Sequence, residues 1–108
     1  MAAERFLCGL GMRLVARDVR LKAGQVDLLM LDGECLVVVE VKARAGRMFG
    51  LPQEGVHWRK LRKLEQLAAM LRQQHPHLGR TERIDVVAVD LDRDGRAVRC
   101  DHIPNVTA

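Results

Sequence analysis

The sequence predicts an α/β fold in which helices flank a mixed β-sheet, with the elements in the order α-β-β-β-α-β-β. Three observations point to this fold: a valine-rich strand at residues 36–43, an uninterrupted amphipathic helix at 56–73, and an apolar strand at 83–91. This succession of strand, long helix and strand is typical of a parallel crossover. A chain of 108 residues has the size of one domain, so we expect residues 1–108 to form a single domain.

The first part of the chain predicts a short helix followed by three strands. Residues 2–10 have helical character and end at a glycine, which is a common helix stop. Residues 14–21 alternate weakly between apolar and polar side chains, and residues 25–31 precede Asp32-Gly33, a strong hairpin signal. Strand 36–43 is expected to be buried on both faces because valine predominates on both.

The helix predicted at residues 56–73 has no interior glycine or proline, and its apolar side chains recur at helical spacing. Lys60 falls within the apolar face, where either its stem covers apolar surface or its ammonium reaches a phosphate near Glu40 and Lys42. Trp58 lies on the polar side, as a lone surface aromatic, a stacking platform or a dimer contact. Pro76 and Gly79 follow the helix, and residues 97–103 form a last, weaker strand.

The composition excludes several classes of protein. With 48% hydrophobic and 30% charged residues, the chain is globular rather than disordered. No apolar run exceeds five residues, far short of the ~20 that a membrane-spanning helix needs, and no signal peptide is recognisable. We therefore expect a cytoplasmic protein. Its three cysteines are widely spaced, which argues against a disulfide framework and against a zinc site.

The positive charge is concentrated in one fifth of the chain. Residues 42–63 carry a net charge of +6, whereas the whole chain carries +4. Such a patch fits either a polyanionic partner, above all nucleic acid, or a solvated basic helix. The basic residues of this segment are Lys42, Arg44, Arg47, Arg59, Lys60, Arg62 and Lys63.

Two strands carry acidic residues at positions that the predicted hairpin brings together. Strand residues two apart share a face, so Glu40 and Lys42 point the same way, and pairing about Asp32-Gly33 brings Asp27 close to Glu40. Two oxygen ligands with a backbone carbonyl between Glu40 and Lys42, that of Val41, suit Mg²⁺ or Mn²⁺. A structural ion pair with Lys42 explains the same residues, and spacing alone favours it.

Four segments resemble a known family when they are taken in order. They are residues 24–29 (Gly-Gln-Val-Asp-Leu-Leu), 37–44 (Val-Val-Val-Glu-Val-Lys-Ala-Arg), 49–60 (beginning Phe-Gly-Leu-Pro) and 83–89 (Arg-Ile-Asp-Val-Val-Ala-Val). The chain resembles the bacterial YraN family of Holliday-junction-resolvase-like proteins, within the PD-(D/E)xK nuclease superfamily. Gln25 stands where that family usually has glutamate.

The resemblance implies a restriction-endonuclease-like core and a metal-dependent endonuclease acting on DNA, including branched DNA. It implies that Asp27 and Glu40 bind Mg²⁺ or Mn²⁺ and that Lys42 is the catalytic lysine, with Gln25 as an auxiliary residue. Arg44, Arg47, Arg59, Lys60, Arg62 and Lys63 are candidate phosphate contacts, whereas Asp85 is expected in a cap or salt bridge. Analogy with junction resolvases suggests a homodimer.

Two other functions stay open at this point. The chain can be a non-catalytic nucleic-acid-binding protein on a decayed nuclease fold, for which the neutral Gln25 is an argument. It can also be a small interaction domain whose basic helix meets an acidic protein.

Overall fold

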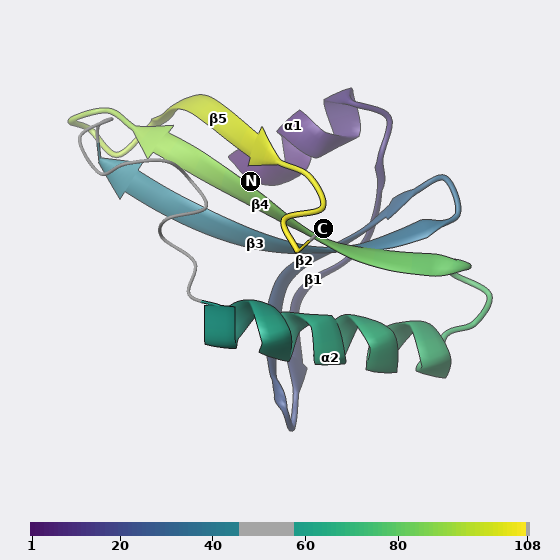
Figure 1. Cartoon of the computed structure of the whole chain (residues 1–108). Coiled ribbons are helices and arrows are strands. Elements are labelled where there is room, and N and C mark those ends of the chain that lie inside the picture. Colours follow the sequence, from purple (N-terminus) through teal and green to yellow (C-terminus); the bar gives the residue numbers. More distant parts are fainter. Residues whose placement is uncertain (46–57, 108) are drawn as a thin grey trace.

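The computed structural model describes residues 1–45 and 58–107, and its elements follow the predicted order. They are α1 (Ala2–Gly9), β1 (Arg13–Leu21), β2 (Gly24–Asp32), β3 (Cys35–Ala45), α2 (Trp58–Gln74), β4 (Thr81–Leu91) and β5 (Ala97–Ile103). The described strands form one sheet in the order β1-β2-β3-β4-β5, in which only β3 and β4 are parallel. The two described helices lie on opposite faces (Figure 1). This mixed α/β architecture is the predicted one and is consistent with a restriction-endonuclease-like core.

Some boundaries differ from the prediction by a few residues. The strands β3 and β4 are longer than expected because their parallel register runs unbroken from Cys35–Thr81 to Ala45–Leu91, so each extension pairs with the other. The β2–β3 turn consists of Gly33 and Glu34, and Gly33 has a φ of 58°, as the first central residue of a type II′ turn requires. A loop was predicted from Arg44 to about Gln53, but Arg44 and Ala45 belong to β3; the rest of that loop and the predicted helix start at Val56 lie outside the described residues.

The central strands of the sheet are buried on both faces, as the valine-rich sequence of β3 predicted. On the α2 side, buried residues of the helix at helical spacing pack against the central strands; the helix contributes Leu64, Leu67, Ala68 and Leu71. On the other side, the α1 residues Ala3 and Leu7 pack against apolar residues of β2, β3 and β4. Neither of the described helices combines the length and the apolar character needed to cross a bilayer.

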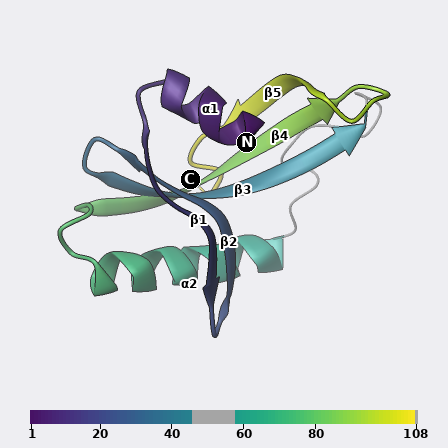
Figure 2. The same ribbon diagram turned by 180° about the vertical axis from the view of Figure 1, so that it is seen from behind.

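The β1–β2 hairpin crosses α2, and its tip projects beyond the helix in the view of Figure 2. Gly24 allows this approach: a Cβ atom there would stand 3.2 Å from Leu67 Cδ1 and 3.4 Å from Lys63 Cε. Both distances are shorter than, or at the limit of, ordinary van der Waals contact. The small residue therefore brings the first residues of β2 next to the first turns of α2.

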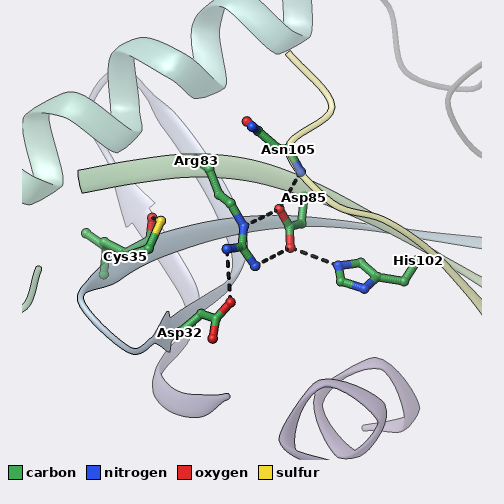
Figure 3. Close-up of polar contacts among 7 residues, drawn as sticks. Asp32, Cys35, Arg83, Asp85, His102 and Asn105 are labelled. Atoms are coloured by element: carbon green, nitrogen blue, oxygen red, sulfur yellow. Dashed lines mark hydrogen bonds and ion pairs between the residues drawn. The ribbon is translucent and has the colours of Figure 1, made fainter. Parts of the chain in front are cut away.

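A buried polar network on the α1 side of the sheet centres on Asp85 (Figure 3). The Asp85 side chain is fully buried and accepts hydrogen bonds of 2.9 and 3.2 Å from Arg83. The ring nitrogen Nε2 of His102 lies 2.8 Å from Asp85 Oδ2, and the Asn105 N–H donates to Oδ1 at 2.8 Å. The hydrogen bond to Asp85 raises the pKa of the Arg83 guanidinium. The predicted salt bridge of Asp85 is confirmed.

Replacing Asp85 is expected to destabilise the protein strongly. Asp85→Ala leaves Arg83 and the Asn105 N–H without their buried acceptor, and losing one partner of a buried pair costs about 3–5 kcal/mol. Asp32→Ala is the matched control. The Asp32 carboxylate is the second ion-pair partner of Arg83, at 3.0 Å, and the Asp32 side chain is 45% exposed. We expect this control to cost about 1 kcal/mol or less. Urea unfolding measures both, and equal losses would contradict the structural role of Asp85.

Candidate functional site

The candidate site lies where β2 separates from β3. The antiparallel register of these strands extends from Asp32–Cys35 to Leu28–Val39. Beyond that pair the Asp27 side chain takes the place of a backbone partner, since its Oδ2 accepts a hydrogen bond of 2.9 Å from the Val41 N–H. A carboxylate is thereby fixed between the two strands, one of its oxygens bound to β3.

Glu40 is the neighbouring carboxylate and lies on the face of β3 that packs against α2. Its side chain is 6% exposed, and its Oε1 forms an ion pair with the Lys60 ammonium from the first turn of α2. The Lys60 side chain is 52% exposed, so it connects the buried carboxylate with the surface. In the structure the Lys60 ammonium pairs with the Glu40 carboxylate, and its predicted contact with a phosphate stays a prediction.

A cavity of 280 Å³ joins these side chains. Leu64 and Leu67 of α2 form its apolar part, and the exposed Gln25 lies where it meets the surface. The polar part contains two carboxylates and two ammonium groups, which balance each other in charge. The described lining consists of Gly24, Gln25, Asp27, Glu40, Lys60, Lys63, Leu64 and Leu67.

Lys42 and Val41 lie just beyond the cavity on β3. Lys42 is half-buried and shares the α2 side of the strand with Glu40, as the alternation of strand side chains predicted. The Val41 N–H points toward Asp27, and in a strand the C=O of the same residue points to the same side. The Val41 carbonyl therefore faces the side of β3 on which Asp27 stands.

This donor set fits a hard divalent cation. Within residues 1–45 and 58–107, no cluster of three or more histidine, cysteine, aspartate or glutamate side chains is placed to hold a metal. The possible oxygen ligands at this cavity are the two carboxylates of Asp27 and Glu40 and the backbone carbonyl of Val41. Mg²⁺ commonly binds through one or two carboxylates and keeps several waters, so a third acidic ligand is not required. Asp85 cannot supply one because it belongs to the network on the opposite face.

The predicted phosphate contacts divide into two groups. Arg59, Arg62 and Lys63 are exposed on α2, and Lys63 also lines the cavity together with Lys60. Arg44 is 13% exposed and pairs with Asp90 and with Asp101, whose Oδ2 lies 2.5 Å from it. The hydrogen bond to Asp90 raises the pKa of Arg44. Any phosphate at Arg44 would share it with two carboxylates. Arg47 lies outside the described residues.

The sequence interpretation missed this Arg44 cluster, although a signal for it was present. In the observed register Arg44 pairs with Asp90 across the parallel strands β3 and β4, and Asp90 pairs with Arg99 on β5. Arg44 and Asp90 stand near the ends of two apolar strands that a crossover helix joins, and this arrangement predicts that the two side chains form an ion pair. The exposed aromatic Trp58 was noticed, but its contacts with Arg59 and Arg62 were not predicted.

Comparison with known proteins agrees with the motifs. The model of the uncharacterised protein family UPF0102 matches residues 1–89. A UPF0102 protein of Pelotomaculum thermopropionicum is 40% identical over 104 residues, which are 96% of this chain and 87% of that protein. UPF0102 proteins of Symbiobacterium thermophilum and Beutenbergia cavernae are 43% and 44% identical with the same coverage. The chain therefore belongs to the UPF0102 family, the YraN family that its motifs predicted.

Proposed function

We propose that this protein is a metal-dependent endonuclease acting on the phosphodiester bonds of DNA, with branched DNA among its substrates. The observation that carries the proposal is the pair of carboxylates, Asp27 and Glu40, brought to one cavity at the border of β2 and β3. Neighbouring carboxylates repel each other and favour a cation between them. The PD-(D/E)xK resemblance supports the same residues, with Lys42 as the catalytic lysine.

Each residue of the site has a role in this proposal. A bound Mg²⁺ or Mn²⁺ would activate a water molecule and stabilise negative charge on the phosphate. Asp27, Glu40 and the Val41 carbonyl would hold it. Lys42 orients the water or neutralises charge that develops on the phosphate oxygens. Gln25 offers a neutral hydrogen-bonding group at the surface of the cavity.

The exposed basic residues of α2 would bind the DNA backbone. Arg59 and Arg62 are exposed on the helix and Lys63 lines the cavity; contacts of such residues with phosphates fix the position of a duplex without reading its sequence. Cutting the two strands of a junction symmetrically needs two sites, so we expect a homodimer on branched DNA.

A non-catalytic nucleic-acid-binding protein is the second candidate. The observation that favours it is the ion pair of Lys60 with Glu40, which already balances one of the two carboxylates. The neutral Gln25 on the cavity wall points the same way. This candidate shares the basic helix with the first and differs from it in lacking cleavage.

Metal binding is expected to depend on Asp27. Asp27→Asn keeps an oxygen that can accept from the Val41 N–H but removes the negative charge, so we expect Mn²⁺ affinity to fall by about 10-fold or more. Calorimetric titration of Mn²⁺ measures the change. Asp94→Asn, in the exposed turn after β4, is the control and should bind as the wild type does. Equal affinities in all three proteins would contradict the assignment of Asp27.

Lys60 is expected to compete with the cation for Glu40. Lys60→Gln frees this carboxylate, and because a half-exposed ion pair is worth about 1 kcal/mol or less, Mn²⁺ affinity should rise by up to about fivefold. Lys63→Gln is the matched control, since it removes one positive charge from the lining of the same cavity. An equal rise in both variants would show a general charge effect, contrary to a specific competition at Glu40.

Cleavage is expected to require Glu40. With Mg²⁺ or Mn²⁺ present, Glu40→Gln should lower the cleavage rate of a labelled four-way DNA junction by about 100-fold or more, because it removes a metal ligand. Glu65→Gln, an exposed residue of α2, is the control. Undiminished cleavage by Glu40→Gln would contradict the mechanism. Salt-dependent DNA binding by the wild type without cleavage would favour the second candidate.

A further inference from the structure

Trp58 begins the described part of α2 and projects away from the sheet. It is 55% exposed, and it precedes Lys60 by two residues, or about 200° around the helix. Lys60 reaches inward to Glu40, so Trp58 stands on the outer side. The other described large apolar residues of α2 turn toward the sheet, where they form the core.

Two arginines surround the Trp58 ring. The Cζ atom of Arg59 lies 5.3 Å from the ring centroid, and that of Arg62 lies 5.9 Å from it. These distances are within the range of cation–π attraction, and Arg62 is one helical turn away, where side chains of a helix meet. A lone exposed aromatic needs no explanation, but this one is held inside a cluster of guanidinium groups.

An indole beside guanidinium groups has the chemistry that recognises an unpaired nucleotide. A base stacks on an aromatic ring, while arginines bind the adjoining phosphates. A duplex buries the faces of its bases, so it offers the phosphates but not the stacking partner. Acidic peptides would use the arginines alone and leave the indole without a role.

The cluster is continuous with the proposed active site. Lys60 and Lys63, from the same two helical turns, line the cavity that contains Asp27 and Glu40. A helix with its side chains is about 10–12 Å wide, so this is the distance across α2 between the Trp58 cluster and the cavity that a nucleic-acid strand would cover. Within the described residues, the cavity and the Trp58 cluster are therefore close enough for one nucleic-acid strand to contact both.

We propose that Trp58, Arg59 and Arg62 form a binding site for an unpaired nucleotide, with the base stacked on the indole and its phosphates at the guanidinium groups. The site gives the protein a preference for DNA with single-stranded or opened segments next to the point of cleavage. This inference rests on the proposed function and specifies its substrate class.

The chain reports directly on this site because Trp58 is its one tryptophan and it contains no tyrosine. Titration with a single-stranded thymidine oligonucleotide should quench the tryptophan fluorescence, whereas a blunt duplex hairpin should quench it far less. Labelled oligonucleotides give both affinities by anisotropy. Trp58→Ala should lower the ratio of single-stranded to duplex affinity by about five- to a hundredfold, and Trp58→Phe should retain most of it.

Control variants separate stacking from charge and from general apolar binding. Val98→Ala changes a 63% exposed apolar residue on β5, and Arg93→Gln removes an exposed charge in the turn after β4. Neither should change the affinity ratio, whereas Arg62→Gln should weaken the binding of both nucleic acids because both present phosphates to its guanidinium group.

Three outcomes would overturn the inference. One is single-stranded binding without quenching, and another is an unchanged affinity ratio in Trp58→Ala. A third is a change of oligomeric state in Trp58→Ala without a change in that ratio, which would assign Trp58 to a contact between copies. If duplex binding and metal-dependent cleavage persist in these cases, the proposed function stands. Failure of the wild type to bind either nucleic acid would overturn both.

Discussion

The hydrogen bond from the Val41 N–H to the Asp27 carboxylate determines the geometry of the candidate site. It stands where the next pair of the β2–β3 ladder would form, after Leu28–Val39. Continued backbone pairing would close the sheet at this point and leave the acidic residues as ordinary strand side chains. Because the side chain replaces the ladder, β2 leaves β3 toward α2, and Gly24 allows its first residues to touch Leu67. A carboxylate, a cavity and the start of a basic helix meet as a consequence.

The sheet separates this site from the buried carboxylate of Asp85. Asp85 lies on the α1 side, where Arg83, His102 and the Asn105 N–H satisfy its oxygens. Asn105 has a φ of 50°, a left-handed conformation that asparagine adopts more readily than most residues, and the Val106 N–H donates to the Ile84 carbonyl. The Asp85 network thus fixes the chain after β5 against β4. Because these partners satisfy the oxygens of Asp85 on the α1 side, its buried carboxylate takes no part in the candidate site on the α2 side.

The sequence predicted the elements well because their signals are local. Valine runs, the spacing of leucines in α2 and the hairpin turn each act over a few residues, and the alternation of side chains placed Glu40 and Lys42 on one face. It did not predict the ion pairs of Arg44 with Asp90 and Asp101. In the sequence, an arginine beside a motif looks the same whether its side chain is solvated or paired with carboxylates. That distinction depends on the β3–β4–β5 register. The hydrogen bond between Asp27 and the β3 backbone likewise depends on the residue at which β2 separates from β3, and no local sequence pattern predicts that residue.

The distribution of charge follows from the same partners and shapes what can approach the site. Arg44 is compensated inside the sheet, and the cavity holds Asp27 and Glu40 against Lys60 and Lys63. The cavity is therefore close to neutral, and exposed positive charges of α2, those of Arg59 and Arg62, lie outside it. A polyanion is attracted first to that side, at Arg59 and Arg62, and not into the carboxylates themselves. Each further positive charge in the cavity would draw a phosphate inward. In the proposed function, the binding of a divalent cation and the approach of the DNA backbone would therefore be coupled electrostatically, and the ion pair of Lys60 with Glu40 lies where the two would meet.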